Sequence, residues 1–320
     1  MEIRQVRYFV RVVQTGSISR AAESLGIAQP ALSAQMAHLE QELGCQLLSR
    51  SSRGVSPTEA GEAFYGRAKI LLKQFDSLAR IGSELSANPA GHVVVGMPTS
   101  AATMLAVPLM RGLKEHYPAI TISLMESPSA YLGDLLLEGR LDLSLLFDEN
   151  RGRGISSEPL FTEDLFIVGI PTREAELPLL SLDGCRIVMP AQPNSIRKLL
   201  DRACAESGIR IEMIAEVSSP STMLQLAHAG IAATILPWSV IGASGGIEGL
   251  PVARLAGPGL SRRVSIAVAS EAPRSPAMLA VKGLLKQAVA SLIASGAWKG
   301  AALSDDSVGD RPGTETHTDG

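Results

Sequence analysis

Apolar residues recur at helical spacing in three short segments at the start of the chain. The first predicted helix ends at Gly16, and Ser17 is a suitable N-cap for the second. A third helix is predicted over 29–44, with Pro30 in its first turn, where the missing N–H costs nothing. The positions predicted to face inward are Ile3, Val6, Phe9, Val10 and Val13, then Ile18, Ala21, Ala22 and Leu25, and finally Leu32, Met36, Leu39 and Leu43.

The outward face of the third helix carries short, almost uncharged side chains, so it could lie deep in a DNA major groove. Gln can bind adenine, Ser can bond to bases or phosphates, and Ala can contact a thymine methyl. Two arginines without neighbouring acids follow in a turn-rich segment, as in the hairpin of a winged helix-turn-helix. The alternative is an ordinary three-helix bundle with a polar face. The candidate DNA-contacting residues are Arg20, Gln29, Pro30, Ser33, Ala34, His38, Arg50 and Arg53.

A longer helix is predicted next. Ser56-Pro57-Thr58-Glu59 has the pattern of a capping box with proline at the first helical position. Apolar residues then alternate spacings of four and three up to Leu85, which is a coiled-coil seam. Such a seam predicts a dimer, whose two recognition helices would meet a pseudo-palindromic site. Packing of this helix on its own C-terminal domain is the alternative. The candidate dimerisation residues are Phe64, Leu71, Phe75, Leu78 and Leu85.

From His92 onward, short apolar strands alternate with helices, which predicts a parallel sheet in an α/β domain. A helix-glycine-strand unit occurs around Gly139 and again around Gly230, which fits two similar subdomains. The first is expected at about 92–163, with the chain returning at about 266–296. The second is expected at about 164–265. A double crossover between them would form a hinge.

Ligands of such folds bind between the lobes, at the carboxyl ends of the strands. Four hydroxyl-rich helix starts should converge there, and their backbone N–H groups favour a small anion, although Ser and Thr also start helices for capping alone. We find no dedicated Arg or Lys in these segments, so we expect a monocarboxylate or a neutral ligand rather than a dianion. Tyr131 is expected to border the site. The candidate effector-binding residues are Thr99, Ser100, Pro128, Ser129, Phe147, Asn194, Ser195, Ser219 and Thr222.

Length, composition and charge limit the number of domains and the classes of protein that are possible. A chain of 320 residues predicts two or three domains, and 4% aromatic residues predict aliphatic cores. The net charge is −3, but residues 1–87 hold ten Lys/Arg against eight Asp/Glu, which weakly favours nucleic acid at that end. No uncharged apolar stretch reaches about 18 residues, so no membrane span is expected. The N-terminus lacks the features of a signal peptide, so we expect a cytoplasmic protein.

The sequence contains no convincing motif for catalysis, metal binding or cofactor binding. The three cysteines form no CxxC pair and the five histidines no metal spacing, so neither a metal nor a cofactor is expected. Buried reduced thiols are the favoured interpretation, and redox sensing by Cys204 is the alternative. The GxSxG match at 242–246 and the SxxK match at 195–198 lack the context of an active site. We therefore expect no enzyme. Residues 300–320 are polar and are predicted to be disordered.

Residues 1–87 resemble the winged helix-turn-helix and linker helix of the LysR-type transcriptional regulators. The matching pieces are FVRVVQTGSISRAAESLGIAQPALSAQMAHLEQELGCQLLSR and PTEAG. The resemblance implies an α + α/β architecture whose C-terminal part is like a periplasmic binding protein. It places the DNA-binding domain at 1–57, the linker helix at 58–88, the effector domain at 89–299 and a tail at 300–320. DNA contacts map onto Gln29, Pro30, Ser33 and Ala34, and onto Arg50 and Arg53 in the wing. Many members carry Arg where Ala34 stands and Phe where Leu48 stands.

This resemblance implies a sequence-specific DNA-binding regulator that forms a homodimer or homotetramer on double-stranded DNA. A small-molecule effector, such as a small organic anion, would act by rotating one lobe against the other, and RNA polymerase is a further expected partner. Two alternatives remain. SRGVSPTEAG is similar to the nitrogen-assimilation-control branch of the family, in which abundance alone controls activity. The chain could also be a cytoplasmic small-molecule-binding protein whose N-terminal domain only dimerises.

Overall fold

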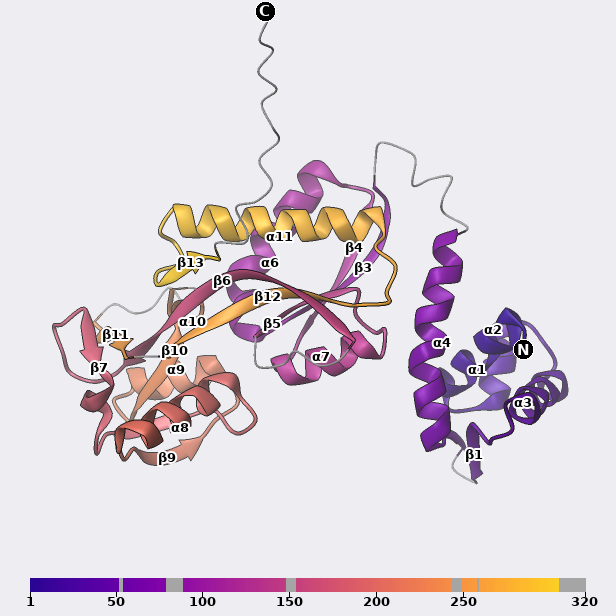
Figure 1. Cartoon of the computed structure of the whole chain (residues 1–320), viewed down its shortest axis with the longest axis horizontal. Coiled ribbons are helices and arrows are strands. Elements are labelled where there is room, and N and C mark those ends of the chain that lie inside the picture. Colours follow the sequence, from indigo (N-terminus) through magenta and orange to yellow (C-terminus); the bar gives the residue numbers. More distant parts are fainter. Residues whose placement is uncertain (52–53, 79–88, 148–153, 243–248, 258, 305–320) are drawn as a thin grey trace, which may run out of the picture.

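The computed structural model describes residues 1–51, 54–78, 89–147, 154–242, 249–257 and 259–304, and it separates into a small helical domain and a large α/β domain (Figure 1). Gly16 ends the first helix in the left-handed conformation, and the Ser17 hydroxyl accepts a hydrogen bond from the Arg20 amide, as predicted. The small domain contains α1 (Ile3–Thr15), α2 (Ile18–Leu25), α3 (Gln29–Leu43), β1 (Leu48–Ser51) and β2 (Gly54–Pro57).

The predicted inward stripes form the core of the small domain. Phe9, Ala21, Leu32 and Leu39 are fully buried, which removes their apolar surface from water. Leu43 was wrongly predicted to be buried: it is 37% exposed, because it is the last residue of α3 and lies outside the core cluster. The strands β1 and β2 pair antiparallel behind α3 and form the wing hairpin, whose turn lies outside the described residues.

The linker helix α4 (Glu59–Leu78) begins later than the capping-box pattern predicts. Pro57 is the last residue of β2 and pairs with Leu48, so Ser56 is in a strand and does not cap the helix. Thr58 takes that role instead, since its hydroxyl accepts a hydrogen bond from the Gly61 amide at 3.0 Å. The prediction of Pro57 inside the helix was therefore wrong, because the second arm of the wing continues into the capping segment.

The first part of the apolar seam of α4 packs into the small domain, and the second part is exposed. Phe64 packs edge-on against Phe9 of the same chain, with ring centroids 5.1 Å apart, so it belongs to the small domain's core rather than to a free seam. Leu71, Phe75 and Leu78 are 41%, 44% and 64% exposed. Their exposure leaves an apolar stripe on the second half of the helix. Leu85 lies outside the described residues.

The same helix also contacts the α/β domain of its own chain, as the alternative interpretation expects. Gln74 Nε2 donates to the carbonyl oxygen of Glu271 at 2.7 Å. Ile70 packs so closely on Gly139 that a Cβ added there would lie 3.1 Å from Ile70 Cγ1. The contact therefore joins the linker helix to the glycine turn that follows α7 (Ser129–Leu137).

One eleven-stranded sheet runs through the whole α/β domain, in the order β4-β3-β5-β12-β6-β10-β8-β9. Outside this order, β11 and β13 pair with β6, and β7 pairs with β11. The strands β3, β4 and β5 are mutually parallel, as the alternation predicted, whereas β12 runs antiparallel to β5 and β6. The strands are β3 (Gly91–Met97), β4 (Ile120–Glu126), β5 (Leu143–Phe147), β6 (Ile155–Val168), β7 (Glu176–Pro178), β8 (Arg186–Met189), β9 (Glu212–Glu216), β10 (Ala233–Pro237), β11 (Val252–Ala256), β12 (Ser261–Ala269) and β13 (Ala301–Leu303).

The long strand β6 runs through both lobes of this domain. Residues Ile155–Asp164 of β6 pair with β12, and the remainder of β6 pairs with β10 and β11. We call the lobe around β3, β4 and β5 subdomain I and the lobe around β8, β9 and β10 subdomain II. The helices of subdomain I are α6 (Thr99–His116), α7 and α11 (Pro276–Ala294). Those of subdomain II are η2 (Leu179–Leu182), α8 (Ser195–Ser207), α9 (Pro220–His228) and α10 (Trp238–Ile241).

Helix α11 is long and apolar enough to cross a membrane by length and composition alone. It instead contributes Val281, Leu285 and Val289 to the core of subdomain I, beside α6 (Figure 1). Its Lys282 and Lys286 both form ion pairs with Glu158 of β6. These contacts identify it as a core helix with one charged edge.

Candidate functional site

The outward face of α3 carries most of the residues predicted to contact DNA. Gln29, Pro30, Ala34 and His38 are all exposed. Ser33 is half-buried, since its hydroxyl accepts a hydrogen bond from Arg50 Nη1 of the wing at 3.1 Å. The fold thus brings the helix and the hairpin into direct contact, although 17 residues separate the two side chains. Arg53 lies outside the described residues.

Two other predicted DNA contacts are engaged within the chain. Arg20 Nη2 donates to the carbonyl oxygen of Thr15 at 2.6 Å, at the junction of α1 and α2. His38 Nδ1 lies 3.0 Å from Gln5 Nε2 of α1 and 3.9 Å from a Glu42 carboxylate oxygen. Both side chains remain exposed at the surface, so DNA could compete for them.

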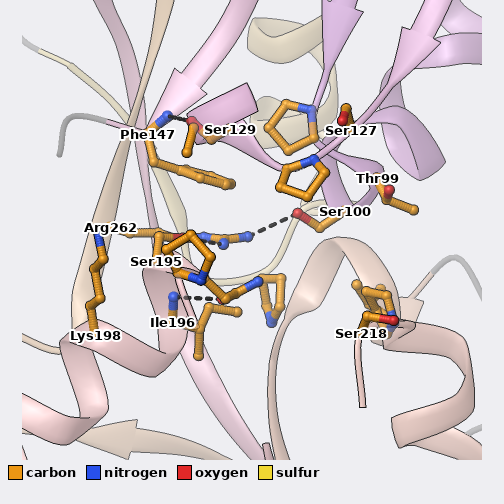
Figure 2. A pocket seen from close by; sticks show the side chains of 18 of the residues that line it. Thr99, Ser100, Ser127, Ser129, Phe147, Ser195, Ile196, Lys198, Ser218 and Arg262 are labelled. Carbon is orange, nitrogen blue, oxygen red and sulfur yellow. Dashed lines mark hydrogen bonds between the residues drawn. The ribbon is translucent and has the colours of Figure 1, made fainter. Parts of the chain in front are cut away.

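A cavity of about 250 Å³ opens between the two subdomains. The starts of α6, α7, α8 and α9 all reach it, as the sequence predicts (Figure 2). Two of the polar groups at these starts already hold the local backbone: Asn194 Oδ1 accepts from the Ile196 amide, and Ser129 Oγ from the Phe147 amide, both at 2.9 Å. The predicted residues that line the cavity are Thr99, Ser100, Pro128, Ser129, Phe147, Asn194 and Ser195.

Ser219, Thr222 and Tyr131 do not line the cavity, contrary to prediction. The Ser219 hydroxyl caps α9 by accepting from the Thr222 amide at 3.3 Å, and Thr222 itself faces solvent. Tyr131 is 49% exposed on the outer side of α7. Their neighbours Ser218 and Pro220 reach the cavity instead. Hydroxyl-rich helix starts thus located the cleft, but some of those hydroxyls serve only as caps.

The expectation of a cleft without Arg or Lys was wrong. Arg262 and Lys198 both line the cavity, and Arg262 is buried. The guanidinium of Arg262 donates from Nη2 to Ser100 Oγ at 3.0 Å and from Nη1 to Ser195 Oγ at 3.4 Å (Figure 2). It also lies over the Phe147 ring, 3.9 Å from the ring centroid. Arg262 thereby links the first turn of α6 in subdomain I to that of α8 in subdomain II.

A buried carboxylate holds Arg262 in place. Glu163 Oε1 accepts from Arg262 Nε at 2.7 Å, and Glu163 Oε2 accepts from Trp298 Nε1 at 3.2 Å. All three side chains are buried, and Trp298 also packs edge-on against Phe161. A buried charge must be paired and hydrogen-bonded to be tolerated. No sequence signal marked this pair, because Glu163 is one of three acidic residues in β6 and Arg262 is one of two adjacent arginines in β12.

Metal binding and thiol chemistry find no dedicated site among the described residues. No group of three or more His, Cys, Asp or Glu within the described ranges is placed to hold a metal ion. Burial raises the pKa of the Cys204 thiol and of the Cys185 thiol, and nearby Asp201 and Asp183 act in the same direction. Since the thiolate is the reactive form, these cysteines suit a structural role better than redox sensing.

Comparison with known proteins agrees with this architecture. Residues 3–62 match the model of the bacterial regulatory helix-turn-helix proteins of the lysR family, and residues 86–290 match the LysR substrate binding domain. The nitrogen assimilation regulatory protein nac of Klebsiella aerogenes is 34% identical over 289 residues, which cover 89% of this chain and 94% of that protein. Its counterpart in Escherichia coli K12 is 33% identical over 297 residues, covering 91% and 96%.

Solved structures share the fold over nearly the whole chain. Full-length OxyR from Pseudomonas aeruginosa superposes with a TM-score of 0.74 at 23% identity, covering 90% of this chain and 97% of that one. Full-length CbnR in complex with its target DNA gives a TM-score of 0.61 at 24% identity, covering 90% and 100%.

The fold and its cleft define a winged helix-turn-helix domain joined through a helix to a two-lobed ligand-binding domain. The chain belongs to the LysR family of transcriptional regulators. It is therefore a DNA-binding regulator with an effector-binding domain, and the interpretation as a small-molecule-binding protein without DNA function was wrong. Proteins of this family bind DNA and small-molecule effectors, and they oligomerise.

Proposed function

We propose that this protein is a sequence-specific transcriptional regulator whose DNA binding is controlled by a small organic anion in the cleft. One observation carries the proposal: Arg262 binds Ser100 of one lobe and Ser195 of the other at the floor of the cavity. An acidic ligand that takes hydrogen bonds from Arg262 changes the link between the lobes. Differential affinity for two lobe arrangements is what allows a ligand to shift an equilibrium.

On DNA, α3 occupies the major groove with Gln29, Ser33 and Ala34 toward the base edges. Pro30, His38 and Arg20 lie beside it, and Arg50 and Arg53 of the wing contact phosphates or the minor groove. The exposure of the outward face of α3 and the bond between Arg50 and Ser33 support this assignment. Arginine and short polar side chains are suited to these contacts.

Each consecutive segment of the chain has its own function in this proposal. Residues 1–57 bind DNA, 58–88 mediate dimerisation and 89–299 bind the effector. The prediction that a disordered tail begins at residue 300 was wrong for its first residues, because Ala301–Leu303 form β13 and pair with β6. The exposed stripe of Leu71, Phe75 and Leu78 supports pairing of two chains, and contacts between effector domains would join two pairs into a homotetramer. The regulator acts in the cytoplasm, contacts RNA polymerase when bound near a promoter, and catalyses no reaction.

Footprinting on the DNA just upstream of the protein's own gene tests this function. We expect a protected pseudo-palindrome that weakens as salt increases, because phosphate contacts release counterions. Protection should also weaken in Arg53→Ala, and candidate organic acids should alter its extent. Loss of all protection, with and without the acids and at moderate salt, would argue that the chain does not act at this site.

A second candidate is a regulator controlled only by its abundance. The observation that favours it is that the protein's own side chains link the lobes: Arg262 donates to Ser100 of one lobe and to Ser195 of the other, and Glu163 holds it in place. Such a regulator would give the same footprint in every ligand. A thermal-shift screen with organic acids separates the two candidates, because binding to the native state raises the unfolding temperature.

A further inference from the structure

The cleft has an unusual balance of charge. Among the described residues that line it are two cations, Arg262 and Lys198, and none of these described lining residues carries a carboxylate. The charge of Arg262 is matched by Glu163, which lies behind the cavity wall. Lys198 forms no ion pair with any described residue. The cleft therefore offers a ligand one uncompensated positive charge.

Glu163 cannot leave Arg262 without breaking further bonds. Its second carboxylate oxygen accepts from Trp298 Nε1, and its side chain is 3% exposed. A swing toward the cavity would leave a buried indole N–H without a hydrogen-bond partner, which is unfavourable. Arg262 and Glu163 thus act as one neutral unit that presents N–H donors to the cleft.

The three hydrogen bonds that the Arg262 guanidinium donates differ in length. The bond from Nη1 to Ser195 is 3.4 Å long, whereas those from Nη2 to Ser100 and from Nε to Glu163 are 3.0 and 2.7 Å. The Ser195 contact is the weakest of the three, since N–H···O bonds are strongest near 2.9 Å. A carboxylate oxygen entering from the cavity would replace Ser195 at Nη1 as a shorter, charge-assisted bond.

The remaining wall is suited to a short hydrocarbon body. Phe147, Leu236 and Val240 face the cavity together with prolines from several loops. Among the described lining residues, a second carboxylate on the ligand would find no second free cation. Burying an unpaired charge is costly, so the wall disfavours a dianion.

We propose that the cleft selects ligands by charge count, binding short monocarboxylates through Lys198 and Arg262 and rejecting dicarboxylates, with Glu163 as the residue that sets this preference. This inference rests on the proposed function, because it assumes that the cleft is the effector site. It adds the class of ligand and assigns a specificity role to a residue that the ligand does not touch.

The test compares three five-carbon probes, pentanoate, pentanamide and pentanedioate, by isothermal titration calorimetry on the full-length protein. Wild type should bind pentanoate at least about ten-fold more tightly than either of the others, the gain of roughly one charge-assisted hydrogen bond. Glu163→Gln leaves Arg262 uncompensated and should reverse the order of the two acids. Equal binding of both acids by wild type, or an unchanged order in a folded Glu163→Gln, would overturn the proposal.

Lys198→Gln covers the case in which Glu163→Gln does not fold, since Lys198 is exposed and its loss leaves the buried pair intact. It should remove the preference for pentanoate over pentanamide without weakening the amide. Arg210→Gln is the matched control: Arg210 is an exposed cation of subdomain II that does not line this cavity, and its loss should change nothing. If Lys198→Gln still binds pentanoate more tightly than pentanamide, the inference is wrong.

Footprints recorded in parallel separate this inference from the proposed function. If acid and amide bind equally and both alter the footprint, the charge-count rule fails while effector control stands. If no probe binds, the charge-count rule fails, and the screen with other acids decides effector control.

Discussion

Arg50 in the wing donates a hydrogen bond to the hydroxyl of Ser33 on the recognition helix, across 3.1 Å. The hairpin and the helix therefore form one continuous surface, and the proposed function assigns DNA to this surface. Replacing Arg50 with Ala should weaken binding to all sequences alike. It should lower the slope of log affinity against log salt by about two for a dimer, as expected when each of the two chains loses one phosphate contact.

Arg186→Ala provides the control for this experiment. It also removes one positive charge, but from an exposed position on β8 in subdomain II. Fluorescence anisotropy over a salt series should leave its slope equal to wild type. If Arg50→Ala keeps the full salt slope, Arg50 serves only to position Ser33.

The exposed stripe on α4 gives a prediction about assembly. Leu71→Glu or Phe75→Glu should raise the dimer dissociation constant by at least about ten-fold, because a charge buried in an apolar seam must lose its water. Sedimentation velocity over a concentration series measures this. Leu279→Glu on α11, where the leucine is 48% exposed, removes a comparable apolar group and should leave the dimer intact. Identical behaviour of all three variants would place the dimer interface elsewhere.

Two glycines allow the contact between α4 and the α/β domain to be measured. Gly139 and Gly230 each follow a helix and have φ of 65° and 67°. Alanine at either position should cost about 1–2 kcal/mol, the strain of a left-handed residue with a Cβ. Only at Gly139 does the added Cβ meet Ile70; at Gly230 it meets nothing within 4 Å.

We therefore expect Gly139→Ala to alter DNA affinity or its response to ligand, and Gly230→Ala to lower only stability. Chemical denaturation and DNA titration of both variants provide the comparison. If the two variants bind DNA identically, the contact with Ile70 does not influence DNA binding.

The cysteines differ in exposure and should differ in reactivity. Burial raises the pKa of the Cys204 thiol, so at neutral pH it stays protonated and reacts slowly, and its alkylation should accelerate only as the pH rises toward that pKa. Iodoacetamide should modify exposed Cys45 first, which mass spectrometry of peptides can show. Peroxide should leave DNA binding unchanged. Rapid modification of Cys204 in the folded protein would revive the redox alternative.

Local patterns were enough to predict α3 and the cap at Ser17, because each depends on residues within one or two turns of each other, where periodicity and capping rules apply directly. The cleft formed by the helix starts was predicted instead from topology, since ligands of open α/β sheets bind at the carboxyl ends of the strands. The group of Arg262, Glu163 and Trp298 was missed because its members lie 99 and 135 residues apart and meet only through the pairing of β6 with β12 and the return of the chain after α11. Leu43 and Ser56 were misassigned at element ends, where one residue of shift changes the environment.

Trp298 has a consequence for the order in which the protein is made. The DNA-binding domain is complete once Leu78 has been synthesised, whereas the floor of the cleft needs an indole near the end of the described chain. At about 5–20 residues per second, roughly ten to forty seconds separate the two. A nascent chain, or one truncated before Trp298, can therefore hold a finished DNA-reading domain while the cleft that would govern it is still incomplete.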